Sequence, residues 1–276
     1  MRRLLLAALL LLPAAAPAAA QGVPDALRGT WAAGSCAAPT ALLHVTARSV
    51  ARLPADGPAR LVRFRTLRDQ DGWTLGTGAG GEAPRVMLRA RDDALELAEP
   101  DAKLRDDRLP GATAVTQWLR CQAGDVRLSL LHGEGLAFLG TLERLEAACQ
   151  TGPMPICIGA LVAEADVSGD GLLSVAEVAR LLRGAAWALA VQQGGDVEGI
   201  AIAGGLGGVA ALTAARLLVG SLDYDGDGRL SPAELAQDRL VFPSGAGSPD
   251  GRPGTIEALA EGAGLLRNLL ERIASE

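Results

Sequence analysis

Two twelve-residue stretches in the C-terminal half constrain the fold of this chain more than any other feature. They run from Asp166 to Glu177 and from Asp223 to Glu234. Each has oxygen-bearing side chains at positions 1, 3, 5 and 9, glycine at position 6 and glutamate at position 12. Alternate side chains of a short curled loop point toward its centre, and the glycine allows the sharp bend. The spacing therefore predicts two loops that each enclose a cation with hard oxygen ligands.

Oxygen ligands in this arrangement suit calcium, which takes roughly 6 to 8 of them at about 2.3 to 2.6 Å. The first loop offers the backbone carbonyl of Leu172 and the side chains of Asp166, Ser168, Asp170, Ser174 and Glu177. The second loop offers the backbone carbonyl of Arg229 and the side chains of Asp223, Asp225, Asp227, Ser231 and Glu234. The pattern resembles that of EF-hand proteins, and the resemblance implies two bound Ca²⁺ ions. The first loop has three carboxylates against four in the second, which leaves its occupancy open.

Helices are predicted on both sides of these loops. Each loop ends in a helix-start signal in which a serine can cap the helix and a glutamate lies in its first turn, Ser174 with Glu177 and Ser231 with Glu234. Apolar residues follow helical spacing before the first loop, after it and before the second loop: Ile158, Leu161, Val162 and Ala165; Val178, Leu181, Leu182 and Ala185; Ala215, Leu218, Val219 and Leu222. The helix after Glu234 is poorly supported, because proline disfavours helix in the residue before it and Pro243 follows closely.

The segment between the loops is longer than EF-hand pairs usually allow. Gln192–Gly195 and Gly204–Gly208 are interpreted as breaks, because glycine weakens a helix. Residues 199–215 carry no charge, but their five glycines and the following Arg216 argue against a membrane span. Beyond the second loop, Thr255 can cap a final helix with one apolar face, formed by Leu266, Leu269, Leu270 and Ile273.

The N-terminus predicts export. Residues 1–20 have the three regions of a signal peptide in the expected order. A positively charged start, Met1-Arg2-Arg3, is followed by a leucine-rich apolar run and by an alanine-rich stretch, with cleavage expected after Ala20. The apolar run is too short for a stable membrane span. We therefore expect a secreted or periplasmic protein, in a compartment where disulfides persist.

The four cysteines are then expected to form disulfides, for which three pairings exist. The pairing of neighbours along the chain joins Cys149 to Cys157 and leaves Cys36 for Cys121. A thiolate metal site or a catalytic cysteine is not favoured, because the sequence lacks CxxC spacing and a suitable histidine.

Residues 21–134 predict a β-rich domain. Apolar residues alternate with arginines in 62–65 and in 85–91, and turn residues separate the short runs. Strands with one apolar and one charged face indicate an antiparallel barrel or sandwich with its core on one side, and Trp31, Trp73 and Trp118 are expected in that core. The expected fold class is therefore α+β, with an antiparallel β barrel or sandwich followed by an all-helical paired EF-hand module.

The start of this domain carries a second, shorter pattern. Gly29-Thr30-Trp31 is followed by Cys36 and by Leu42-Leu43-His44-Val45-Thr46. These residues resemble the first strand of lipocalin-like barrels, which include small bacterial inhibitors of secreted metalloproteases. The resemblance implies a barrel that binds a protein or a small ligand.

Two helical regions are expected to follow. Residues 135–152 are predicted to form a linker helix, because Phe138, Leu142, Leu145 and Cys149 recur at helical spacing. Residues 153–276 are predicted to form the EF-hand helical domain. The chain has a formal net charge of −6, and residues 151–276 hold sixteen acidic residues and eight arginines. Because residues 21–150 are neutral overall, the excess acid belongs to the predicted calcium module.

Composition and motifs narrow the expected function. No basic stripe interleaves with aromatic residues, so nucleic acid is not an expected partner. His44 and His132 lack metal or nucleophile spacing, and neither HExxH nor GxSxG occurs, so no enzyme is predicted. We expect an exported calcium-binding protein in which the ion is mainly structural. The alternative is a β-domain that binds an unidentified protein or ligand and is clamped by the calcium module.

Overall fold

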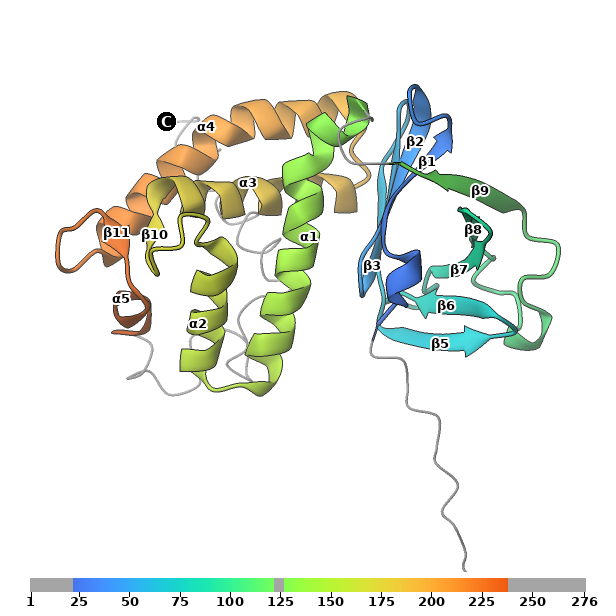
Figure 1. Ribbon diagram of the computed structural model, residues 1–276, viewed down its shortest axis with the longest axis horizontal. Coiled ribbons are helices and arrows are strands. Elements are labelled where there is room, and N and C mark those ends of the chain that lie inside the picture. Colours follow the sequence, from blue (N-terminus) through green and yellow to red (C-terminus); the bar gives the residue numbers. More distant parts are fainter. Residues whose placement is uncertain (1–21, 122–126, 238–276) are drawn as a thin grey trace, which may run out of the picture.

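The structure is a computed structural model that describes residues 22–121 and 127–237 (Figure 1). The predicted signal peptide and the predicted final helix from Thr255 lie outside these residues. The described chain is α+β, as expected. An antiparallel sheet occupies its N-terminal half, and helices occupy its C-terminal half.

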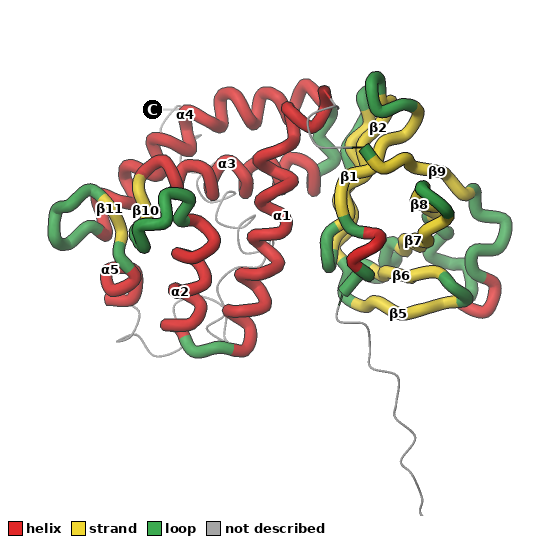
Figure 2. Tube along the Cα trace, viewed as in Figure 1, coloured by secondary structure: helices red, strands yellow, loops and turns green. Residues whose placement is uncertain are grey.

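Nine antiparallel strands form one strongly curled sheet (Figure 2). The strands are β1 (Gly29–Gly34), β2 (Pro39–Val45), β3 (Ser49–Pro54), β4 (Arg60–Arg63), β5 (Thr66–Gln70), β6 (Trp73–Thr77), β7 (Arg85–Arg91), β8 (Ala94–Ala98) and β9 (Val115–Arg120). Their order in the sheet is β4-β3-β2-β1-β9-β8-β7-β6-β5, so the β1–β9 ladder joins two meanders. Among these strands no ladder pairs the edges β4 and β5, and the sheet is therefore a half-barrel.

The concave side of the sheet is packed with large apolar side chains. Trp31, Phe64 and Trp118 belong to one buried cluster on this side. Trp73 belongs to a second cluster on the opposite face of the sheet, because Met87 of that cluster lies between Val86 and Leu88 of the first along β7. All three tryptophans predicted for the core are at most 4% exposed. The prediction that two-residue alternation marks strands around an apolar core is confirmed.

Strands β1 to β3 differ from the expectation of one apolar and one charged face. Trp31 and Leu43 pack into the half-barrel, but their neighbours Ala32 and Leu42 are also fully buried. The second face packs against helical residues such as Phe138. A sheet that helices cover on its outer side buries both faces of its strands, so the core is not one-sided here.

Within the described residues, five helices follow the sheet (Figure 1). They are α1 (Arg127–Thr151), α2 (Met154–Ala165), α3 (Val175–Gln192), α4 (Val197–Leu222) and α5 (Pro232–Gln237), and two short strands, β10 (Leu173–Ser174) and β11 (Arg229–Leu230), lie in the predicted loops. The predicted break at 192–195 is confirmed between α3 and α4. The predicted break at 204–208 is wrong, because α4 runs through it. Glycine lowers helix stability by about 1 kcal/mol but keeps its N–H and its helical backbone angles, so it does not end a helix by itself.

Helix α1 begins eight residues earlier than the predicted linker helix and is not a free linker. The buried Glu143 carboxylate accepts hydrogen bonds from the Ser49 hydroxyl at 2.6 Å, from the Arg48 N–H at 3.1 Å and from the Thr46 hydroxyl. Glu146 forms a two-pronged ion pair with Arg63 of β4. These carboxylates fix the helix to the sheet, and both halves of the chain share one apolar cluster.

Helices α1 and α3 cross closely enough to require glycine. A Cβ atom at Gly135 of α1 would lie 2.0 Å from the Trp187 ring, and one at Gly184 of α3 would lie 2.5 Å from Phe138. Only a residue without a side chain lets the two backbones approach to this distance. The packing of α3 against α1 therefore explains why a glycine occupies position 135 within a helix.

Two disulfides are present, and both pairings are the predicted ones. Cys36–Cys121 has a sequence separation of 85 and ties the β1–β2 turn to the end of β9. Cys149–Cys157 has a separation of 8 and ties the end of α1 to α2. Because disulfides persist in oxidising compartments, this pairing suggests an extracellular or periplasmic protein.

Lowering the pH from 6.5 toward 4 should destabilise the fold through His132 of α1. This side chain is 1% exposed, its Nδ1 accepts a hydrogen bond from Trp187 Nε1 at 3.0 Å, and burial lowers its pKa from 6.5 to about 4. Since the folded-state pKa lies below the unfolded one, the stabilisation is complete above pH 6.5 and is lost as the pH falls through 4. We expect a loss of about 2 kcal/mol in the free energy of unfolding over this range.

Urea unfolding at several pH values measures this effect. His132→Gln should flatten the pH dependence between pH 6.5 and 4, whatever it does to stability at pH 7. His44 is the matched comparison, because burial also lowers its pKa to about 4 while its Nδ1 is hydrogen-bonded to the Thr30 hydroxyl at 2.9 Å. His44→Gln should remove a similar part of the slope. An unchanged slope in His132→Gln would contradict the prediction.

Candidate metal centre

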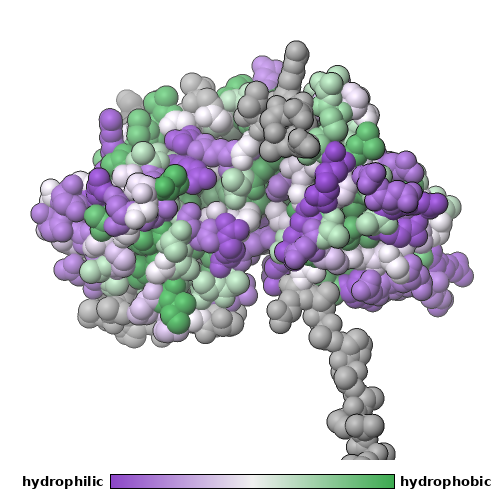
Figure 3. Space-filling view, in the orientation of Figure 1, coloured by the Kyte–Doolittle hydropathy of each residue, from purple (hydrophilic) through white to green (hydrophobic). Residues whose placement is uncertain are grey.

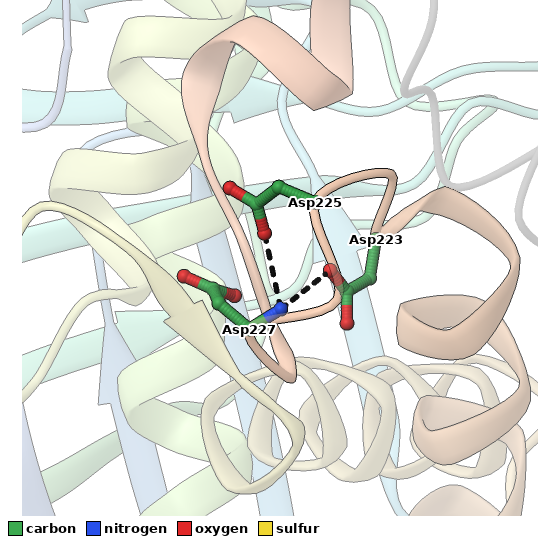
Figure 4. A group of neighbouring side chains, drawn as sticks. All are labelled: Asp223, Asp225 and Asp227. Carbon is green, nitrogen blue, oxygen red and sulfur yellow. Dashed lines mark hydrogen bonds between the residues drawn. The ribbon is translucent and has the colours of Figure 1, made fainter.

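The two predicted loops lie between α2 and α3 and between α4 and α5. In the second loop Asp223, Asp225 and Asp227 each place a carboxylate oxygen within 4.8 Å of the other two (Figure 4). The backbone N–H of Asp227 donates to the carboxylates of Asp223 and Asp225 at 3.1 and 3.0 Å. Among the described residues, Asp223, Asp225 and Asp227 are the three carboxylates that lie close enough together to hold a metal ion.

The first aspartate of each loop organises the backbone that follows it. Asp223 accepts hydrogen bonds from the N–H groups of Gly226 at 2.7 Å and Gly228 at 2.8 Å, one to each carboxylate oxygen. Asp166 accepts from its two corresponding glycines at 2.6 and 2.7 Å. These four glycines have φ between 76° and 80°, a left-handed conformation that favours glycine. The two loops therefore have the same backbone geometry because both have an aspartate at position 1 and glycines at positions 4 and 6.

The last residue of each loop closes it onto the next helix. Glu177 Oε1 accepts hydrogen bonds from the Val167 and Ser168 N–H groups at 2.8 and 3.0 Å, and its Oε2 accepts from the Ser174 N–H and hydroxyl at 2.8 and 2.7 Å. Ser174 and Glu177 form the predicted capping box at the start of α3. Glu234 makes the corresponding contacts with Tyr224, Asp225 and Ser231.

These hydrogen bonds keep both glutamates ionised. Burial alone would raise the pKa of Glu177, but N–H and hydroxyl donors from Ser168 and Ser174 outweigh it and lower the pKa to about 2. Donors from Ser231 likewise lower the pKa of Glu234. Each loop thus holds its position-12 carboxylate in the charged form that a cation requires.

A short antiparallel ladder joins the two loops. Strand β10 pairs with β11, with Leu173 opposite Leu230 and Ser174 opposite Arg229. Both leucines are at most 2% exposed and belong to one apolar cluster with side chains of α2, α3, α4 and α5. This ladder was not predicted, although both loops have a leucine at position 8, which was the signal for it.

No protein-family model matches this chain, and none of the curated proteins or solved structures is similar to it. The candidate metal centre is therefore described from the donor atoms that the two loops offer. These atoms are carboxylate, hydroxyl and backbone carbonyl oxygens, which suit Ca²⁺ or Mg²⁺ and not a soft metal. Asp223 Oδ2, Asp225 Oδ1 and Asp227 Oδ1 each accept one backbone N–H and keep a second lone pair for a cation. Both oxygens of Glu177 and of Glu234 already accept two hydrogen bonds, so some of these bonds must break before either glutamate can bind an ion. The donor set fits calcium.

The two loops are not equivalent. The guanidinium of Arg229, in the second loop, forms an ion pair with the Asp170 carboxylate of the first. The loop pattern predicted a role for the backbone carbonyl of Arg229 and none for its side chain. Arg229 therefore pairs with one of the three carboxylates of the first loop, whereas the second loop has four carboxylates, which include the three clustered aspartates.

The structure brings the predicted ligands together in part. The predicted residues of each loop run from the end of one helix through a short strand into the next helix, which contains Glu177 in α3 and Glu234 in α5. The Glu234 carboxylate is not part of the aspartate cluster. Its oxygens instead accept the hydrogen bonds from Tyr224, Asp225 and Ser231. In the first loop the serine at position 3 cannot contribute a carboxylate, and the Ser168 hydroxyl donates to Asp166 at 3.1 Å.

Proposed function

We propose that the chain is an exported calcium-binding protein of the EF-hand type, with one Ca²⁺ in each loop. The observation that carries the proposal is that two loops 57 residues apart in sequence repeat one set of hydrogen bonds and pair through β10 and β11. Cation loops coupled by a shared ladder hold their ligands at fixed spacing before the ion arrives, which lowers the cost of ordering them. Six predicted oxygen ligands per loop support calcium as the ion.

We propose further that calcium stabilises the fold and does not switch it. Sensor proteins of this type open on binding and expose a methionine-rich groove. Here the helices around the loops meet through Leu, Val, Ile and Ala side chains, and Met154 is the methionine beside that cluster. Helix α1 is also tied to the sheet by two carboxylates and to α2 by a disulfide, which restrains an opening motion.

Calorimetry on the mature, chelator-treated chain should show two bound Ca²⁺ ions per chain. Extracellular modules of this type bind calcium with dissociation constants of about 10⁻⁴ to 10⁻³ M, so the titration needs millimolar calcium. Asp166→Asn should remove one ion and Asp223→Asn the other, because each aspartate carries a position-1 ligand. A wild-type titration without heat at millimolar calcium would show that the loops are not calcium sites.

A hydrophobic-dye titration separates the structural role from a sensor role. A structural ion should raise the melting temperature and leave dye binding unchanged, because no apolar surface opens. An increase in dye binding with an unchanged melting temperature would identify a sensor instead.

A further inference from the structure

Helix α4 has an apolar side that the described chain does not cover. Its 26 residues span about 39 Å. Ala211, Ala215 and Val219 are buried on the side that packs against α3 and the loop cluster. Large apolar side chains elsewhere on the helix are 38–71% exposed, namely Ile202, Val209, Leu212, Leu217 and Leu218. Hydrophobic residues accordingly reach the surface of the helical half in Figure 3.

This side of α4 is unusual for an exposed helix. Ile202, Val209 and Leu217 lie opposite Ala211 and Ala215 when 100° is taken per residue, so these three exposed side chains share one side of the helix, and Leu212 and Leu218 lie outside it. Residues 199–215 carry no charge. Among the described helices, α4 is the one that is long and apolar enough to cross a membrane, as judged by length and composition alone. The exposed Thr213 and Arg216 lie on the same side of α4, so the apolar side chains there form a patch with polar residues among them. An exposed apolar patch marks a surface that another segment or molecule covers.

The chain itself has a segment of matching length. The described residues end at Gln237 in α5, which follows α4 through the second loop, and 39 residues lie beyond it. From Thr255 apolar residues recur at alternating steps of three and four: Ile256, Leu259, Ala263, Leu266, Leu270 and Ile273. A helix over 255–276 would be about 33 Å long, close to the length of α4. The acidic and basic residues of this segment fall outside the apolar stripe.

The connection allows this segment to reach α4. Residues 238–254 can span up to about 56 Å when extended, which exceeds the length of α4. A tethered segment has an effective local concentration of about 1 mM or more, whereas a second copy of the chain must associate from dilute solution. The segment has a net negative charge, with four glutamates against two arginines, which disfavours adsorption to an anionic membrane surface.

We propose that residues 255–276 form an amphipathic helix that packs along the exposed side of α4, with its Leu and Ile stripe against Ile202, Val209 and Leu217. The contact completes the helical half as an intramolecular antiparallel or parallel pair. It also covers the last turns of α4, which lead directly into Asp223 of the second loop. This inference does not depend on whether the loops bind calcium.

A photo-cross-linking residue at position 209 tests the proposal, because Val209 is 69% exposed on α4. The full mature chain carrying it is mixed with an equal amount of isotope-labelled chain and with phosphatidylcholine vesicles, irradiated, digested and read by mass spectrometry. Cross-links should join position 209 to residues 255–276 of the same chain. The matched probe at Val115 of β9, which is 44% exposed, should not capture that segment.

Substitutions in the segment give the second readout. Leu266→Glu combined with Leu270→Glu should lower the cross-link yield at least about tenfold, because burying two charges against an apolar stripe costs well over 1.4 kcal/mol. Asn268→Glu adds the same kind of charge outside the stripe and should leave the yield unchanged. Cross-links from position 209 to the labelled copy, to lipid, or to no part of residues 255–276 would each overturn the proposal.

Discussion

Glu234→Gln should remove most of the stabilisation that calcium gives to this chain. Glu234 is the position-12 ligand of the loop with four carboxylates, and a neutral amide cannot bind the ion through two oxygens. At a calcium concentration a hundred times the dissociation constant, an ion that binds only the folded state contributes about 2.7 kcal/mol. Loss of that term should lower the melting temperature in calcium by roughly 5 to 10 °C for a chain of this size.

Glu177→Gln should have a smaller effect on the same quantity. The first loop has a serine at position 3, and Arg229 neutralises Asp170, so less attraction for the ion is lost there. The readout is the difference between melting temperatures with calcium and with chelator, which cancels effects of either substitution on the empty loops. Glu82→Gln is the control, because Glu82 lies far from both loops in an exposed ion pair with Lys103. A loss in Glu177→Gln as large as in Glu234→Gln would contradict the asymmetry of the loops.

Removal of the Cys36–Cys121 disulfide should destabilise the chain by about 4 to 5 kcal/mol, the cost expected for opening a loop of this size in the chain-entropy account. The bond has a sequence separation of 85, so its loss frees a large part of the unfolded chain. Replacement of Cys149 and Cys157 by alanine should cost less, about 2.5 kcal/mol, since that separation is only 8.

Urea unfolding of the two double-alanine variants compares these losses. Wild-type protein treated with a reductant serves as the control in which both bonds are open. A larger loss from the 149–157 pair than from the 36–121 pair would show that local strain or contacts, and not the size of the closed loop, govern the stabilisation.

Local patterns predicted the elements whose residues contact near neighbours in sequence. Helical spacing predicted α2 and α3, serine with glutamate predicted the capping box of α3, and strand alternation predicted the arginine-lined strand β7. The disulfides followed from export and from the proximity of Cys149 to Cys157. Each of these features depends on residues that lie close together in the sequence, so a local pattern is enough to predict it.

The features that sequence did not predict depend on distant contacts. The close approach of α3 to α1 at Gly135 depends on the Trp187 ring, which lies on a different helix. The outer face of β1 to β3 is buried because helices far along the chain cover it. Arg229 meets Asp170 only because β10 and β11 bring two loops together. Single-residue propensities carry no information about such partners, since tertiary packing overrides them.

The ladder between β1 and β9 has a consequence for synthesis of the chain. The two strands are separated by about eighty residues, and β1 can pair only with β2 until the residues from Val115 onward have emerged. Pairing of this kind is slow to form, because a long loop must close before any contact offsets its entropy. Until then Cys36 has no partner. A chain that stops before Val115 presents β1 as an open strand edge, which is a template for aggregation.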